Sequence, residues 1–336
     1  FFWKLNGNSS SQFQSAYQIV ISPNIENLKK GNTSFFNSEK VKSDKNIQIE
    51  YTGKELEPAT VYYWRVRIWD ENNNPSGWSE PAVFMTGLFN MDDWKGAEWI
   101  SKRPQEEWEE EWWRKKEVEL QCTELHLPSY FGSRMNIWER YHFFNEKPYD
   151  PAPLYRKSFD AEKPVKRATV YISGIGYYEL YMNGEKIGDQ VLDPGWTNYN
   201  KTVLYNVHDV SEQINDGENA IGVMLGRGNF SQLAIDHWGF WRKDGYIGQP
   251  KLICRIKIEY QDGSVKNIVS DSSWKIKDGP VIYDGPRMGE IYDANRESEN
   301  WNYPGIDESG WSNAVLAPKP EGSLKAQLCD PIRIIK

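Results

Sequence analysis

Aromatic side chains gather in segments rich in Gly, Asn and Asp, where loops are expected. The apolar face of a sugar ring packs on such side chains, while its hydroxyl groups bond to Asp, Asn and Arg. The residues that predict a carbohydrate-binding surface on this ground are Trp196, Tyr199, Asn229, Trp238, Trp241 and Arg242. The stretch 236–245 equally suits packing against another module, because Trp and Arg are enriched at interfaces. Both interpretations stay open.

Motifs for other chemistries are missing from the sequence. It has no G-x-S-x-G for an acyl-transfer serine, no phosphate-binding G-x-x-x-x-G-K and no H-E-x-x-H for a metalloprotease. The three cysteines, Cys122, Cys254 and Cys329, are too scattered for a zinc site or a disulfide framework. Cys254 falls on the apolar face of a strand pattern, which predicts a buried thiol.

The composition excludes several classes of partner. The chain has 336 residues, with 40 Lys and Arg against 48 Asp and Glu, so its net charge is −8. A negative chain is a poor ligand for the phosphate backbone, and we expect no nucleic-acid partner. No window has the roughly 18 apolar residues of a membrane span. The 16 Trp and 19 Tyr are the main departure from average usage.

The first ninety residues have the pattern of strands. Apolar residues alternate with others in the segments 16–21 and 60–70, and 78–86 supplies a last strand. In the second segment Tyr62, Trp64 and Val66 share one face, and Arg65 and Arg67 share the other with aromatic residues. Arginine stems and rings can cover each other there while the guanidinium stays in water. No helix is expected in this part.

The middle of the chain predicts a connection and an insertion. Residues 89–103 read as a linker with Trp94 and Trp99 as anchors. Residues 104–150 form an insertion rich in Trp and Glu, with a short helix between Glu106 and Lys116. Its crowded carboxylates favour a solvated face over a cation site.

Residues 151–320 predict a larger antiparallel sandwich. Asn183-Gly184 lies between two strand patterns and is a strong hairpin signal. Alternating apolar residues at 252–260 form another strand, which the turn Asp262-Gly263 closes. Many strands without helical crossovers indicate a sandwich or jelly roll, so the fold class is all-β.

Two regions of the sequence resemble known families. Residues 63–70, YWRVRIWD, with SGWS at 76–79, resemble the end of a fibronectin type III-like β-sandwich. The stretches GYYELYMNGEKIGD at 176–189, LDPGWTNY at 192–199 and GEIYDAN at 289–295 resemble the N-terminal β-jelly roll of bacterial α-L-rhamnosidases, glycoside hydrolase family 78. The resemblance implies that residues 1–88 and 151–320 are these two domains, and that 321–336 begins the connection to a downstream module.

The resemblance also implies a function. In this family the sugar-cleaving carboxylates lie in a downstream (α/α)6 barrel, so we assign no catalytic residue here. The resemblance implies two partners, rhamnose-containing carbohydrates and the downstream catalytic domain. In some relatives the jelly roll binds rhamnose through calcium. Asp189 and Gln190 match that site, with Gln where Asn is expected, and Asp189 would be the calcium ligand. That Asp189 only ends a turn is a slightly better explanation.

Two alternatives remain open from the residues themselves. The chain could be a free-standing carbohydrate-binding protein or adhesin built from the same modules, or an enzyme with a carboxylate pair in the jelly-roll loops. The start, FFWKL, looks like the inside of a strand, so we expect further residues upstream. It lacks the charged and apolar regions of a signal peptide, so these residues decide nothing about export. A periplasmic or extracellular location is favoured over a cytoplasmic one.

Overall fold

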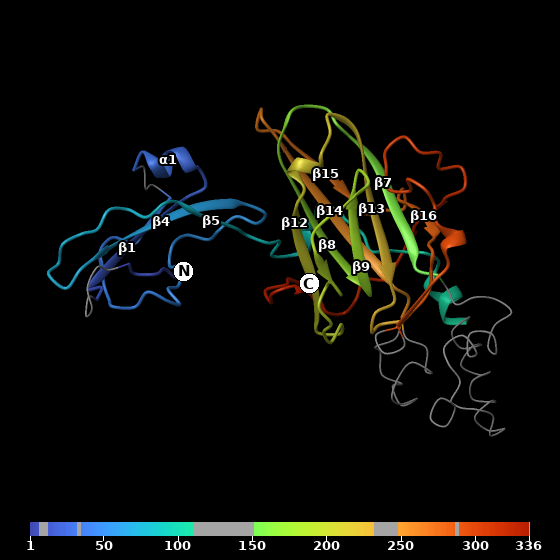
Figure 1. Ribbon diagram of the computed structural model, residues 1–336, viewed down its shortest axis with the longest axis horizontal. Helices are drawn as coiled ribbons and strands as arrows, with labels where there is room; N and C mark the ends of the chain where they lie inside the picture. The colour runs from blue at the N-terminus through green and yellow to red at the C-terminus, as the bar shows by residue number, and fades with distance from the viewer. Residues whose placement is uncertain (7–12, 32–34, 111–150, 232–247, 286–288, 336) are drawn as a thin grey trace, which may run out of the picture. The chain divides into compact units, whose positions relative to one another are not determined.

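The computed structural model describes residues 1–6, 13–31, 35–110, 151–231, 248–285 and 289–335, which divide into two compact units. Unit 1 is Phe1–Phe89 and unit 2 is Asn90–Lys336 (Figure 1). The described part is β-rich in both units, as the sequence predicts. Its helices are too short and too polar to cross a membrane.

Unit 1 has one sheet in the order β2-β1-β4-β5, with β3 also paired to β1. The strands are β1 (Ala16–Ser22), β2 (Phe36–Asn37), β3 (Val41–Lys42), β4 (Val61–Trp69) and β5 (Ala82–Met85). The two longer strands predicted at 16–21 and 60–70 are confirmed as β1 and β4, which pair antiparallel from Ala16↔Trp69 to Ser22↔Tyr63. The predicted last strand is shorter than expected, since β5 covers only 82–85 of 78–86.

The apolar face of this sheet forms the core of unit 1. Ile19, Ile21, Tyr62 and Val66 are buried there, with half-buried aromatic residues packed around them. One expectation is wrong: a helical turn, α1 (Ile25–Lys29), follows β1. It forms because the Asn24 side chain accepts hydrogen bonds from the first free backbone N–H groups, a strong N-cap signal.

The other face of β4 carries the predicted stack of arginine and aromatic side chains. The Arg67 guanidinium lies 5.0 Å from the ring centre of Trp69 and 4.9 Å from that of Trp78. Arg65 lies 4.8 Å from the Trp78 ring, and both arginines stay partly exposed. These distances are those of cation–π contacts.

Unit 2 contains two large sheets. One has the order β10-β9-β13-β7-β16-β19 and the other β20-β6-β14-β8-β12-β21, with β15 paired to β14. The short strands β11 and β22 pair with each other, as do β17 and β18. All pairs are antiparallel except β12 with β21. Figure 1 shows the long strands of the two sheets as facing layers.

The strands of the first large sheet are β7 (Pro153–Ala161), β9 (Tyr177–Met182), β10 (Glu185–Lys186), β13 (Gly217–Gly226), β16 (Lys275–Asp278) and β19 (Ser312–Asn313). Those of the second are β6 (Ile100–Ser101), β8 (Val165–Ile175), β12 (Thr202–Asp209), β14 (Lys251–Tyr260), β15 (Val265–Val269), β20 (Val315–Leu316) and β21 (Ser323–Ala326). The small pairs are β11 (Gln190–Val191) with β22 (Ile332–Arg333), and β17 (Val281–Gly285) with β18 (Gly289–Tyr292). Short 3₁₀ turns lie at Met91–Trp94, Ser211–Gln213 and Ala294–Arg296. Residues 105–110 are helical, as predicted for the start of the insertion, and 111–150 lie outside the described residues.

Turn chemistry sets the register of these strands. Asn183 and Gly184 have φ angles of 51° and 88°, which are the two left-handed positions of a type I′ hairpin between β9 and β10. The predicted strand 252–260 is confirmed as β14, and it turns into β15 after Asp262-Gly263.

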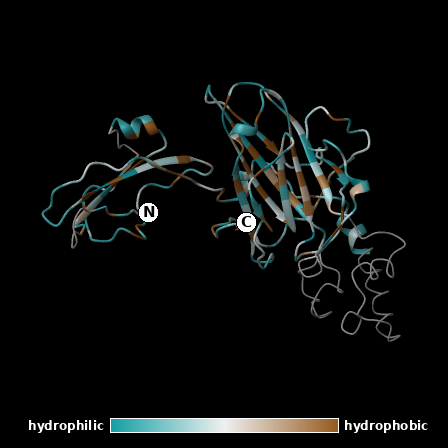
Figure 2. Ribbon diagram, viewed as in Figure 1, coloured by the Kyte–Doolittle hydropathy of each residue, from teal (hydrophilic) through white to brown (hydrophobic). Residues whose placement is uncertain are grey.

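The inward faces of the two sheets make the core of unit 2. Tyr155, Leu180 and Val223 from one sheet meet Ile172 and Cys254 from the other, and all are fully buried. Burial raises the pKa of the Cys254 thiol, as expected for the predicted buried cysteine. Figure 2 shows apolar residues, in brown, recurring along these strands.

The described residues of the segment 279–311 cover the outer face of the first large sheet. Trp301 packs edge-on against Tyr181 at 5.4 Å between ring centres, and a Cβ on Gly222 would collide with Trp301 at 2.8 Å. Arg156 is fully buried on this face, with Glu308 as its ion-pair partner and the Tyr303 carbonyl oxygen as a hydrogen-bond acceptor at 2.8 Å. The covering segment therefore places polar groups where a sheet face would otherwise meet water.

Candidate functional site

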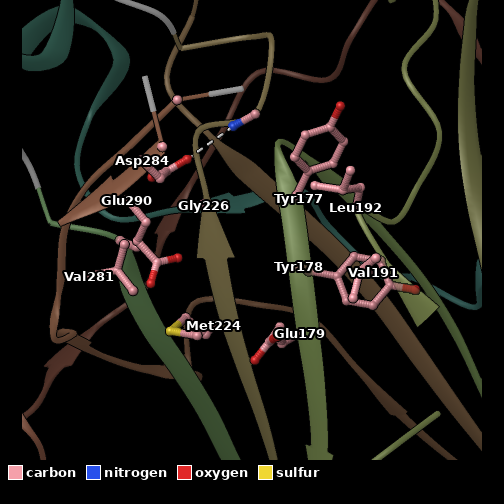
Figure 3. Close-up of a pocket in the computed structure, with 14 residues that line it drawn as sticks. Tyr177, Tyr178, Glu179, Val191, Leu192, Met224, Gly226, Val281, Asp284 and Glu290 are labelled. Atoms are coloured by element: carbon pink, nitrogen blue, oxygen red, sulfur yellow. Dashed lines mark hydrogen bonds between the residues drawn. The ribbon is translucent and has the colours of Figure 1, made fainter. Parts of the chain in front are cut away.

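A pocket of about 280 Å³ lies between the outer face of β9 and β13 and the hairpin β17–β18. Figure 3 shows Asp284 and Glu290 on one side of it, and Tyr177 and Leu192 on the opposite side. Its lining residues are Ala152, Tyr177, Tyr178, Glu179, Val191, Leu192, Met224, Gly226, Gly228, Val281, Asp284, Gly285, Gly289 and Glu290. A pocket with a mainly apolar wall and few polar groups is the usual form of a small-molecule site.

Asp284 is the most deeply placed carboxylate of the pocket. Its Oδ1 accepts hydrogen bonds from the backbone N–H groups of Arg227 at 2.7 Å and Gly228 at 3.4 Å. Its Oδ2 is buried and has no hydrogen-bond partner. Burial raises the pKa of this carboxyl, while the positive charge of Arg227 and the two N–H groups oppose that shift. A Cβ on Gly226 would lie 3.0 Å from Oδ1, so a glycine lets the carboxylate approach the strand.

Glu290 stands directly opposite Asp284 in the register of the hairpin. Burial raises the pKa of the Glu290 carboxyl, and the negative charges of Asp284 and Glu179 raise it further. Directly opposed like charges destabilise an antiparallel pair. The hairpin therefore holds two carboxylates close together at a cost in stability.

The opposite wall is aromatic and positioned by hydrogen bonds. The Tyr177 hydroxyl accepts a hydrogen bond from the Asn229 side-chain amide at 3.2 Å. Glu179, lower in the pocket, forms an ion pair with Lys186 and accepts a hydrogen bond from the Tyr181 hydroxyl at 2.7 Å. Met224, Val281 and Val191 supply apolar surface between the walls.

The two carboxylates do not have the arrangement of a hydrolytic pair. In a glycosidase the two acids flank the scissile bond from opposite sides. Asp284 and Glu290 are neighbours on adjacent strands of one hairpin, on the same side of the pocket. The arrangement suits binding of hydroxyl groups, and we assign no catalytic residue.

The described residues among those predicted from sequence differ in exposure and in contacts. Asn229 does not line the pocket itself, but its side-chain amide donates a hydrogen bond to the lining residue Tyr177. Trp196 is half exposed, with 50% of its surface accessible. Tyr199 is buried, and its ring packs edge-on against Phe230 at 5.4 Å. Trp238, Trp241 and Arg242 lie outside the described residues.

Asp189 and Gln190 point in different directions. The Asp189 carboxylate is largely exposed and accepts a hydrogen bond from Arg333 Nε at 2.7 Å, which lowers the pKa of that carboxyl. Gln190 on β11 instead directs its amide nitrogen to Nδ1 of the buried His208 at 3.2 Å. The structure thus does not bring these two side chains together on one ligand.

Comparison with known proteins gives the family. The model of the alpha-L-rhamnosidase N-terminal domain matches residues 163–336, and that of the Rha78A-like, N-terminal immunoglobulin domain matches residues 1–90. The chain belongs to the family of alpha-L-rhamnosidase N-terminal domains. The match over residues 1–90 agrees with the sandwich predicted there, since immunoglobulin and fibronectin type III domains share that architecture.

The curated relatives of this rhamnosidase-type chain are much longer than it is. An alpha-L-rhamnosidase from Formosa agariphila is 33% identical over 99% of the chain, and one from Alteromonas sp. is 30% identical over 96%. The chain spans about a third of the length of each, 33% and 31%. The structure of alpha-L-rhamnosidase from Dictyoglumus thermophilum is similar over 100% of the chain and 33% of that protein, with 39% identity and a TM-score of 0.79.

A calcium site at Asp189 does not fit the described side chains of this rhamnosidase N-terminal domain. Calcium takes six to eight oxygen ligands. The Asp189 carboxylate is engaged by the Arg333 guanidinium, and Gln190 faces His208. Within the described ranges no group of three or more His, Cys, Asp or Glu side chains could hold a metal ion.

Sequence reasoning missed Asp284 and Glu290 as site residues. Glu290 lies within the GEIYDAN stretch that carries the family resemblance, but only as part of a motif. A signal was present, since two acids flank the stretch between Gly285 and Gly289 at positions that pair in a hairpin. Their proximity to Tyr177 depends on the path of segment 279–293, which no local pattern gives.

Proposed function

We propose that this chain is the N-terminal, non-catalytic region of an alpha-L-rhamnosidase that acts on rhamnose-containing glycans or glycosides. The observation that carries the proposal is the match over nearly the whole chain to alpha-L-rhamnosidases of which it spans about a third. Its β-sandwich modules would support a catalytic module that lies downstream in the same polypeptide.

Exposed apolar side chains favour a protein partner for unit 2. Leu328, Ile334 and Ile335 have 93%, 76% and 94% of their surface accessible. The pairing of β22 with β11 holds this segment against the jelly roll next to the Asp189–Arg333 ion pair. Such apolar surface near an ordered strand suits packing against another module.

The domain boundaries belong to the same proposal. Residues 1–88 are the fibronectin-like sandwich, 89–103 the linker, 104–150 an insertion, 151–320 the jelly roll and 321–336 the start of the connection. Limited proteolysis followed by mass spectrometry should place the first cut near 89–90, between the two compact units, because Trp94, Trp99 and Ile100 within 89–103 are buried.

The test of the function is hydrolysis of an aryl α-L-rhamnoside. The polypeptide encoded by the complete gene should release the aryl group, and residues 1–336 alone should not. A gene that encodes no further module, or release by the fragment alone, would contradict the proposal. The first result would favour a free-standing carbohydrate-binding protein or adhesin.

Sugar binding by the jelly roll is the second part of the proposal. Supporting it are the half-exposed ring of Trp196 and the hydrogen bond through which Asn229 holds Tyr177. The other residues proposed to bind carbohydrate are Asp189, Gln190, Tyr199, Trp238, Trp241 and Arg242. The last three lie outside the described residues, and their stretch equally suits packing against another module. Trp196→Ala should weaken binding of L-rhamnose in titration calorimetry, and an unchanged affinity would remove Trp196 from the site.

A further inference from the structure

The hairpin β17–β18 holds two carboxylates in unfavourable surroundings. Asp284 and Glu290 are register partners on it, and partial burial, followed by the negative charge of Asp284, raises the pKa of the Glu290 carboxyl. Oδ2 of Asp284 is buried without a hydrogen-bond partner, and the Glu290 side chain beside it is open to solvent. A buried acceptor left unpaired costs roughly 1–3 kcal/mol. Together these groups indicate a place for hydrogen-bond donors that come from outside the chain.

Backbone strain marks the rim of the same pocket. Leu192 has a φ of 60°, in the left-handed region that a bulky residue rarely adopts. Its side chain is half exposed and lies on the wall opposite Asp284 (Figure 3). Residues with strained backbone angles cluster at ligand sites, where the surrounding structure holds them in the conformation that function requires.

The charges of the pocket argue against a cationic ligand. The positive charge of Arg227 already acts on Asp284, and Lys186 forms an ion pair with Glu179. Calcium would need more oxygen ligands than two carboxylates supply, and the described residues hold no suitable cluster of metal-binding side chains. What Oδ2 of Asp284 lacks is a hydrogen-bond donor, and a neutral hydroxyl group can supply one.

We propose that this pocket binds one neutral sugar ring, whose hydroxyl groups donate to Asp284 Oδ2 and Glu290 and whose apolar face packs on Tyr177. The volume of about 280 Å³ lies just below the range typical of pockets for drug-sized ligands, which suits a single ring. Met224 and Val281 give an apolar surface for the methyl group of a 6-deoxy sugar. A uronic acid is excluded, because its carboxylate would face two others.

The choice of first probe rests on the proposed function, which names rhamnose, but the site itself does not depend on a downstream module. Titration calorimetry of residues 1–336 with L-rhamnose, methyl α-L-rhamnoside, D-galactose and D-glucuronate should detect binding of at least one neutral sugar and none of glucuronate. The same titration with EDTA present should give the same affinity.

Two variants test the carboxylates without removing the local fold. Asp284→Asn keeps the Oδ1 acceptor for the Arg227 and Gly228 N–H groups and changes only the free oxygen, so affinity should fall roughly tenfold. Glu290→Gln should weaken binding several-fold and also raise the melting temperature, because it removes a like-charge pair. Glu185→Gln on exposed β10 is the matched control and should change neither quantity.

The outcomes separate this inference from the proposed function. If no sugar of the panel binds, or if both variants bind as the unchanged chain does, the pocket is not a sugar site, whatever the complete polypeptide hydrolyses. Heat with Ca²⁺ alone that Asp284→Asn abolishes would make it a cation site and overturn the proposal. Sugar binding with the expected losses would support it even if hydrolysis of the aryl rhamnoside failed.

Discussion

Arg67 in unit 1 and Arg156 in unit 2 both lie on the sheet face that points away from a core. Arg67 keeps water contact and lies between the rings of Trp69 and Trp78. Arg156 has no exposed surface, because segment 279–311 covers it and Glu308 pairs with it. An outer face can thus be stabilised by stacking in water or by covering with a paired charge.

The difference matters for function. The stacked face is formed by residues that are close together in the sequence. The covered face instead requires a segment from a distant part of the sequence to pack over the sheet. In unit 2 that segment also carries the hairpin with Asp284 and Glu290. The covering therefore creates the pocket between this hairpin and the outer face of β9 and β13.

Loss of the covered arginine is the most severe change we expect. Arg156→Met leaves the Tyr303 carbonyl oxygen and the Glu308 carboxylate without their donor. Breaking a buried pair from one side costs about 3–5 kcal/mol, and the partial exposure of Glu308 favours the lower value. Urea unfolding followed by hydrogen exchange and mass spectrometry should place the loss in unit 2.

A double variant checks the cause. Arg156→Met combined with Glu308→Gln removes the unpaired charge and should recover part of the stability. A loss below about 1 kcal/mol for Arg156→Met would mean that the covered charge is no more important than an exposed one, and the comparison between the faces would fail.

A buried histidine, His208, should make the stability of unit 2 depend on pH. His208 is 7% exposed, its Nε2 lies 2.9 Å from the Tyr178 hydroxyl, and Gln190 donates to Nδ1. Burial lowers the pKa of His208 from 6.5 to about 4. The unfolded chain therefore takes up a proton before the folded one, so this stability is complete above pH 6.5 and decreases as the pH falls to 4. The total is roughly 3 kcal/mol.

Comparison with His208→Gln isolates that contribution from the carboxyl groups. Asp193, for example, has a raised pKa from burial and acts with the opposite sign over part of this range. The difference in unfolding free energy between the two proteins should change with pH between 4 and 6.5, and hydrogen exchange in unit 1 should not follow it. Parallel pH profiles would show that His208 is not buried as described.

The sequence predicts the stacked face better than the covered one. The period of two in 60–70 places Arg65 and Arg67 beside aromatic residues on one face, and Asn183-Gly184 defines a hairpin from two residues. Arg156 alternates with the core residue Tyr155 in the same way, yet its burial depends on Glu308, 152 positions away. Local periodicity carries no information about which segment crosses a sheet.

The candidate site likewise contains some residues that the sequence predicts and others that only the fold brings together. Asn229 was predicted from residue type, and its role of holding Tyr177 required the fold. Tyr199 looked equally suitable but is buried against Phe230, since an aromatic pattern does not distinguish packing from binding. Asp284 and Glu290 become a site only where the hairpin meets β9 and β13.

Loss of the stacked arginine should have the smallest effect. Arg67→Ala removes two cation–π contacts and the hydrogen bond from Nε to Gln18 at 2.8 Å, all partly solvated. Contacts of this kind contribute about 0.5–1 kcal/mol each at exposed sites, and water replaces part of the loss. Arg67→Lys keeps the charge but loses the flat guanidinium, so a similar loss for both variants would show that stacking rather than charge stabilises this face. A loss as large as that of Arg156→Met would mean that unit 1 buries its arginines too, and that the two faces do not differ in kind.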